Sequence, residues 1–267
     1  MGFLKKKEKE EYESVESLIG GGDDYHVYHM SFQDRVIAAL IGAGIGGVVA
    51  YLFFRNLIVT IAAAGAIAVM AQDIYREKRL GKRRKELLLQ FKDLLESLTS
   101  SYATGKNTLD SFRDAQNDLE QIYGEQADIS KELAIIVTGM ENSIKIEDLL
   151  TNFADRSGLD DVESFADVFR VSLRQGANIR DVIASTRDVI NDKIEIEMEI
   201  QTIIAGNKNE LNIMMVMPLV ILVSLGGLGS DMTAASNSPI NVIIKLIALG
   251  MFYLAYRLGR KFTNIEI

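Results

Sequence analysis

The residues Gly105-Lys106-Asn107-Thr108 have types and spacing that suggest a phosphate-binding loop. Such a loop needs Gly-x-x-x-x-Gly-Lys-[Ser/Thr] between a strand and a helix, because backbone N–H groups and the lysine surround the phosphates while the hydroxyl holds Mg²⁺. Here Ser100 occupies the first glycine position and Asn107 occupies the hydroxyl position. The apolar spacing before the turn also indicates a helix rather than a strand. We therefore interpret this stretch as a corner between two helices.

Two further patterns suggest ligand binding, and both are incomplete. His26 and His29 form a His-x-x-His pair in a chain with 2 histidines and no cysteine, which is too few ligands for a zinc site. The run GAGIG at 42–46 resembles part of a dinucleotide loop, but no strand precedes it. We interpret its Gly42 and Gly46 as a pair at which two membrane helices approach closely. The sequence predicts no catalytic residue, no cofactor and no metal.

The corner at residues 101–112 recurs without gaps at residues 172–183, as Ser-x-x-x-Gly-x-Asn-x-x-Asp-x-apolar. In each copy the glycine can end a helix in the left-handed conformation, and the asparagine can cap the next helix. The aspartate three positions later completes a capping-box-like pair at the positive helix start. The six residues with these roles are Gly105, Asn107, Asp110, Gly176, Asn178 and Asp181. The recurrence indicates either an internal duplication or the same capping chemistry used twice.

These corners must be positioned by elements that the hydropathy pattern divides into two kinds. The chain is 48% hydrophobic and 25% charged, and the two classes are segregated along it. A membrane-spanning helix needs about 20 mostly apolar residues. Four segments fit, in two hairpins: 36–54 with 57–71, and 211–229 with 239–256. Pro218 is expected to kink the third span. Lys245 in the fourth is expected to snorkel to the interface, with a functional charge as the alternative.

Basic residues near the span ends predict the orientation of the chain. Residues 75–85 carry seven Lys or Arg, and 256–262 are also basic, whereas the loop at 230–238 has none. We therefore expect both termini and residues 72–210 to be cytoplasmic. We interpret the basic run as a lipid-headgroup contact, with a protein contact as the alternative; its members are Arg76, Lys78, Arg79, Lys82, Arg83, Arg84 and Lys85. The net charge of −8 argues against nucleic-acid binding.

Residues 85–209 show apolar positions three and four apart in six successive segments, which predicts an antiparallel bundle of about six helices. The stretch 193–200 alternates like a strand, but we predict a helix because Glu, Lys and Met are good helix formers. The fold class is therefore all-α, with four transmembrane helices in two hairpins. The predicted regions are a cytoplasmic tail (1–33), a hairpin (34–74), a cytoplasmic helical domain (75–209), a second hairpin (210–258) and a C-terminal tail (259–267).

The order of these elements resembles a known family. After a membrane hairpin and a basic segment come LLESLTSSYATGKNTLDSF and a series of short helices. SLRQGANIRDVIASTRDVINDKIEIEMEIQTIIAGNKNE then leads into a span with a proline. Over roughly residues 75–260 this resembles the F domain of type II secretion and type IV pilus platform proteins. It is most similar to the four-span TadB and TadC type of the tight-adherence (Tad) pilus. One departure is Gly176-Ala177, where the family commonly has two adjacent glycines.

The resemblance implies a non-catalytic platform in the inner membrane, through which a cytoplasmic ATPase drives extraction of pilin subunits and fibre assembly. The implied partners are that secretion ATPase, pilin subunits, a second platform protein or another copy of the chain, and membrane lipid. The acidic cluster Asp160, Asp161 and Glu163 is the candidate ATPase contact, with a solvated helix start as the alternative. A four-span transporter or signalling subunit is the alternative function.

Overall fold

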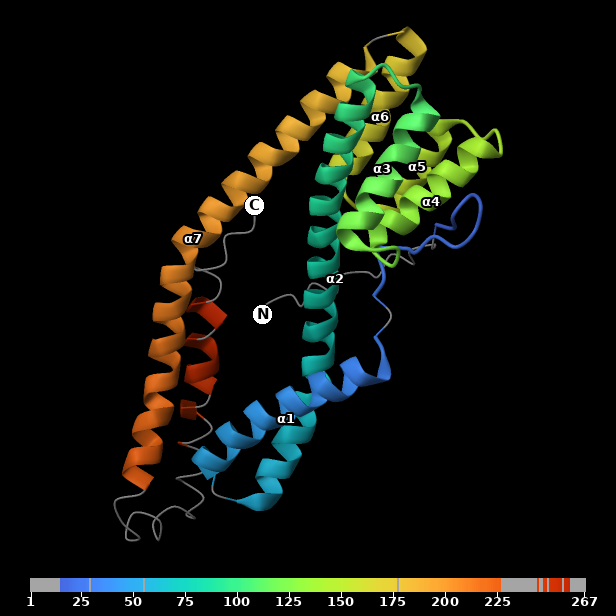
Figure 1. Cartoon of the computed structure of the whole chain (residues 1–267). Coiled ribbons are helices and arrows are strands. Elements are labelled where there is room, and N and C mark those ends of the chain that lie inside the picture. The colour runs from blue at the N-terminus through green and yellow to red at the C-terminus, as the bar shows by residue number, and fades with distance from the viewer. Residues whose placement is uncertain are drawn as a thin grey trace, which may run out of the picture. The chain divides into compact units, whose positions relative to one another are not determined.

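A computed structural model describes residues 15–28, 30–54, 56–176 and 178–226, with isolated positions between 244 and 259. Every regular element in these ranges is a helix, which confirms the all-α class (Figure 1). The chain divides into two compact units, and each gathers segments that are distant in sequence. Unit 1 comprises residues 1–29 and 77–193, and unit 2 comprises residues 30–76 and 194–267.

Unit 1 contains the helices whose apolar stripes the sequence predicts. They are the second part of α2 (Leu57–Ala103), α3 (Thr108–Tyr123), α4 (Asp128–Glu141), α5 (Ile146–Ser157), α6 (Asp160–Gln175) and the start of α7 (Ile179–Gly226). Consecutive helices from α3 to α6 pack against one another. Each has one apolar face, so packing of neighbours removes those faces from water.

The core of unit 1 is formed by aromatic and leucine side chains from several helices. Phe91 of α2 lies 6.2 Å from Phe153 of α5 and 5.5 Å from Phe165 of α6, between ring centroids. These tilted and edge-on geometries are those that aromatic pairs favour. On α7, Ile183 and Ile190 are buried as well. The apolar positions at helical spacing are therefore the ones that form this core.

Two helices are longer than the sequence pattern predicts. The span at 57–71 and the helix from residue 85 form one continuous 47-residue helix, α2, which includes the basic run. The 48-residue α7 contains the alternating stretch 193–200, so the prediction of helix over strand is confirmed there. It also continues through Pro218 to Gly226.

Unit 2 contains α1 (Phe32–Phe54), the first part of α2 and the rest of α7. In the described part of the chain, two helices are long and apolar enough to cross a membrane: α1 over Phe32–Leu52, and α2. Only 22% of the apolar window of α1 is buried, and none of that of α2. The third predicted span is helical as far as Gly226, while its end and half of the fourth span, including Lys245, lie outside the described residues.

The close approach predicted at Gly42 and Gly46 occurs between α1 and α2 within unit 2. A Cβ placed on Gly42 would lie 2.6 Å from Cβ of Ala71, and one on Gly46 would lie 2.7 Å from Cδ1 of Ile67. At Gly42 the added atom would also lie 3.0 Å from backbone atoms of Ala68 and Ile67, so a side chain there requires the helices to shift, whereas at Gly46 the nearest atom is the end of the Ile67 side chain. These two positions therefore act in helix packing, as the Gly-x-x-x-Gly spacing indicates.

Candidate functional site

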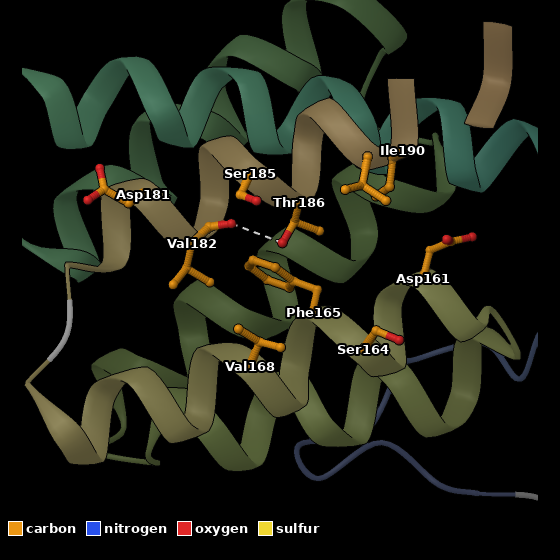
Figure 2. Close-up of a pocket in the computed structure, with 10 residues that line it drawn as sticks. Asp161, Ser164, Phe165, Val168, Asp181, Val182, Ser185, Thr186 and Ile190 are labelled. Atoms are coloured by element: carbon orange, nitrogen blue, oxygen red, sulfur yellow. Dashed lines mark hydrogen bonds between the residues drawn. The ribbon is translucent and has the colours of Figure 1, made fainter. Parts of the chain in front are cut away.

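A groove between α6 and α7 brings together residues from two of the predicted sets. Its cavity has a volume of about 470 Å³. Phe165 and Ile190 form a buried floor, and Val168 and Val189 are exposed by 49% and 61%. Figure 2 shows Asp161 and Asp181 toward opposite ends of the groove, with Phe165 between them. The groove is thus apolar along its length and acidic at its ends.

The spacing of the lining residues explains why a groove forms here. On α6 they are 161, 164, 165 and 168, which fall on one face of a helix. Gly176 ends α6 with φ 67° and ψ 25°, a left-handed conformation that lets the chain turn into α7. Ser164 and Ser185 are small and line the groove, so neither helix fills the space between them. No described residue hydrogen-bonds either serine side chain.

The polar groups of the groove make few interactions. The Lys193 ammonium donates to Oδ2 of Asp161 at 2.7 Å. The Thr186 hydroxyl donates to the Val182 carbonyl at 2.9 Å (Figure 2). Asp181 accepts a hydrogen bond from the side-chain amide of Asn178 at 2.8 Å. Such a surface suits an apolar segment flanked by cations, because exposed valines gain from burial and carboxylates attract positive charge.

Both predicted corners have the backbone geometry that the sequence indicates. Gly105 has φ 82°, in the same left-handed region as Gly176. The side-chain oxygen of Asn107 accepts from the Asp110 N–H at 2.9 Å, and that of Asn178 accepts from the Arg180 N–H at 3.2 Å. The described residues before and after both corners are helical.

The aspartates of the corners act differently from a standard capping box. In that motif the carboxylate accepts from the backbone N–H of the capping residue. Here Asp110 accepts from the side-chain amide of Asn107 at 2.8 Å, and Asp181 accepts from that of Asn178 at the same distance. The Asn–Asp pair therefore closes on itself through its side chains at each corner.

Lys106, the residue that a phosphate loop would need, is engaged elsewhere. Its ammonium forms an ion pair with the carboxylate of Asp114 on α3. The hydrogen bond and charge of Lys106 hold the pKa of Asp114 below its usual value. The contact links the corner to the helix that follows it, which supports the interpretation as a structural corner.

The acidic cluster is divided between two surfaces of unit 1. Asp160, Asp161 and Glu163 lie in the first turn of α6, whose N-cap residue supplies no side-chain hydrogen bond. Acidic groups near an uncapped helix start are stabilised by its positive end. Asp161 lines the groove, whereas Asp160 and Glu163 line a second hollow with Val15.

Two members of the basic run point into unit 1. Arg83 donates to both carboxylate oxygens of Asp128, at 2.6 and 2.7 Å, and to Asp23 at 2.6 Å. The hydrogen bonds to Asp128 raise the pKa of the Arg83 guanidinium. Arg84 donates to the Tyr25 carbonyl at 2.9 Å. Arg83 and Arg84 thus have partners within unit 1, and the headgroup interpretation of the basic run stays a prediction.

Residues 16–26 form a segment that the sequence analysis missed, because it assigned residues 1–33 to a tail. We call this segment the strap. Its Tyr25 is only 1% exposed, and the Tyr25 N–H donates to the Arg156 carbonyl at 2.9 Å. Asn152 of α5 donates to the Glu16 carbonyl at 2.9 Å. A Cβ on Gly22 would collide with the Arg156 guanidinium, so this glycine was a signal that the strap packs closely.

Beneath the strap lies a buried ion pair between α4 and α5. The Arg156 guanidinium donates to the two carboxylate oxygens of Glu132 at 2.7 and 2.5 Å, and the Tyr25 hydroxyl donates to Glu132 at 3.0 Å. Burial alone would lower the pKa of Arg156, but the hydrogen bonds and charge of Glu132 raise it above its usual value. Burial, reinforced by Glu132, raises the pKa of Tyr25. Arg156 also donates to the side-chain oxygen of Asn152, four residues earlier on α5, and to the Asp23 carbonyl, both at 3.0 Å.

The histidine pair is only partly visible. Nδ1 of His26 lies 3.1 Å from a carboxylate oxygen of Asp24, and His29 lies outside the described residues. Within the described ranges, no group of three or more His, Cys, Asp or Glu side chains is arranged to hold a metal ion.

Comparison with known proteins gives no match to a family model, to a curated protein or to a solved structure. The resemblance to secretion and pilus platforms therefore rests on the order of elements and corners in this chain.

Proposed function

We propose that this chain is a non-catalytic inner-membrane platform protein of a Tad or type IV-like pilus, or of a type II secretion-like machine. In this role it couples a cytoplasmic ATPase to extraction of pilin subunits and to fibre assembly. The proposal includes four spans in two hairpins, cytoplasmic termini and a cytoplasmic helical domain. Its partners are the ATPase, pilin subunits, membrane lipid and a second platform protein or another copy.

The observation that carries the proposal is the continuity of α2. This helix has an exposed apolar segment, where Ile61 is 64% exposed, and a core-forming segment, where Leu94 is 1% exposed. α7 likewise contains both kinds of segment without a break in its helical bounds. A hydrogen-bonded helix can pass a displacement along its axis. Such a connection is what a platform needs if work done on its helical domain is to reach the bilayer.

The exposed apolar faces of unit 2 support a membrane location. A core helix of a soluble protein has its apolar window mostly buried, whereas those of α1 and α2 are largely open. Leu211 and Gly259 also lie close together, since a Cβ on Gly259 would overlap the Leu211 side chain. These residues are at the predicted cytoplasmic ends of the third and fourth spans, as a hairpin requires.

Co-purification tests the proposal directly. Gentle extraction of the tagged chain from its native membrane is expected to recover a secretion ATPase and a second four-span protein. Recovery of neither would contradict the platform function. Uptake of a solute into liposomes by the pure chain alone would instead support the transporter alternative.

A single substitution in α7 tests whether helix continuity matters. Asn207 is exposed and helical, so Asn207→Pro removes a backbone hydrogen bond without disturbing a core, and Asn207→Ala is the matched control. We expect Asn207→Pro to reduce fibre assembly about tenfold or more, because an interior proline breaks or kinks the helix. Membrane level and hydrogen-exchange protection of unit 1 should not change. Normal assembly by the proline variant would exclude α7 as the coupling element.

A further inference from the structure

The groove between α6 and α7 presents apolar side chains that no described residue covers. Val168 and Val189 are exposed by 49% and 61% on its walls. Its ends carry Asp161 and Asp181 (Figure 2). The ion pair between Asp161 and Lys193 shows that this rim already accepts an ammonium group. An occupant should therefore combine a short apolar segment with lysines.

The first seven residues of the same chain have this composition, whereas Glu8, Glu10, Glu11 and Glu13 follow in the stretch that leads to Val15. The chain begins MGFLKKKEKEEYES, with the apolar pair Phe3-Leu4 directly before Lys5, Lys6 and Lys7. An apolar pair followed by three ammonium groups complements an apolar groove with carboxylates at its ends.

The strap places the start of the N-terminal tail near the end of the groove that contains Asp161. Val15 lines the hollow that also contains Asp160 and Glu163, next to Asp161 in the first turn of α6. From Asp161 to Val168 is seven helical residues, or about 10 Å. From Leu4 to Val15 is eleven residues, which span up to about 36 Å when extended. Leu4 can thus reach every position in the groove.

We propose that residues 1–14 dock intramolecularly in the groove between α6 and α7, with Phe3-Leu4 against the valines and the lysines near the carboxylates. A short tether raises the effective concentration of the tail to the millimolar range, so a contact that would be weak between separate molecules is substantially occupied. The strap, held by Tyr25 and Asn152, fixes where the tether begins. The tail then covers the groove, and any other ligand of that surface must displace it.

Cysteine cross-linking tests this placement, because the chain has no cysteine of its own. The test variant is Leu4→Cys with Val189→Cys in the full chain. The matched control is Leu4→Cys with Ile122→Cys, since Ile122 on α3 is 65% exposed and outside the groove. Under mild oxidation we expect the first pair to cross-link about tenfold faster, in a monomer-sized product, because of the local concentration. Adding Lys5→Glu, Lys6→Glu and Lys7→Glu should abolish most of this preference.

Each other result overturns the proposal. Equal rates for the two pairs would show that the tail samples unit 1 without preference. A dimer-sized product would assign the groove to the tail of a second copy. If the cross-linking preference persists after the three lysines are replaced by glutamates, charge complementarity does not select the tail as the occupant of the groove. None of these results depends on pilus assembly, so the test is independent of the platform function.

Discussion

Ile61 and Leu94 lie on the same helix, α2, but in opposite environments. Leu94 is 1% exposed in the core of unit 1, and Ile61 is 64% exposed in unit 2. The aromatic contacts of Phe91 show how unit 1 turns apolar groups toward one another, whereas α1 and the start of α2 turn them outward. The two environments on one helix are what the proposed membrane location of unit 2 would produce, because water favours inward burial whereas hydrocarbon would remove that driving force.

The largest expected effect tests how unit 1 tolerates charge in its core. Glu132→Leu leaves the Arg156 guanidinium buried without its partner, which costs about 3–5 kcal/mol when a buried pair is broken. The double variant Glu132→Leu, Arg156→Leu should recover much of this loss, because no unpaired charge remains. Hydrogen exchange of peptides from α4 and α5 in the full chain measures the effect without interference from unit 2.

An exposed ion pair provides the control. Glu86→Gln removes the partner of Lys82, whose ammonium lies 3.5 Å away and is exposed, and should change stability by less than about 1 kcal/mol. If Glu132→Leu has an equally small effect, the buried pair is not what holds α4 against α5.

If unit 2 contacts lipid and unit 1 contacts water, the same charged substitution should have different effects in the two units. Ile61→Lys places a charge on the apolar face of unit 2, and Ile122→Lys does the same on α3 at almost equal exposure, 64% against 65%. A lysine costs about 2.5–3.5 kcal/mol at the middle of a span and less at position 61, which lies nearer the end of the span 57–71, whereas on a water-facing helix it is tolerated. Carbonate extraction of membranes should therefore release Ile61→Lys but not Ile122→Lys. Equal behaviour would contradict lipid contact at Ile61.

The helices of unit 1 were predictable because their signals are local. Apolar residues at spacings of three and four mark each buried face, and Gly105 and Gly176 mark the corners at which the chain turns. The continuity of α2 was not predictable, because the basic run between the apolar stretch 57–71 and the buried positions from Leu87 onward has no apolar stripe of its own. A charged helix in water and a linker have similar compositions.

The strap and its ion pair were not predictable because their partners are distant in sequence. Tyr25 and Glu132 are separated by 107 positions, and Glu132 and Arg156 by 24. Charged residues are usually exposed, so nothing local distinguishes these two from surface residues. The α6–α7 groove was missed for a similar reason: Asp161 and Asp181 were assigned to separate roles, and only the turn at Gly176 brings their helices together.

Glycines have different roles in the two units: those of unit 1 let the chain turn, whereas Gly42 of unit 2 allows two helices to pack closely. Gly42→Leu should weaken the packing of α1 on α2 by about 1–3 kcal/mol, since a side chain there collides with Ala71. Gly44→Leu on the same helix is the control, because its Cβ meets nothing within 4 Å. Thermal unfolding in detergent compares them, and equal stability would show that the α1–α2 contact contributes nothing.

The smallest effect separates the corner from a phosphate site. Lys106→Ala removes an exposed ion pair with Asp114 and should change stability little, because solvent screens such a pair. Gly105→Val should cost about 1–3 kcal/mol, because it forces a branched side chain to φ 82° although open space surrounds its Cβ. Urea unfolding ranks the two variants, and under the proposed platform function fibre assembly supplies a second readout. If the stretch is a structural corner, Gly105→Val lowers both stability and assembly, and Lys106→Ala changes neither substantially. Loss of assembly by a stably folded Lys106→Ala chain would mean that the ammonium itself acts on a partner or a phosphate.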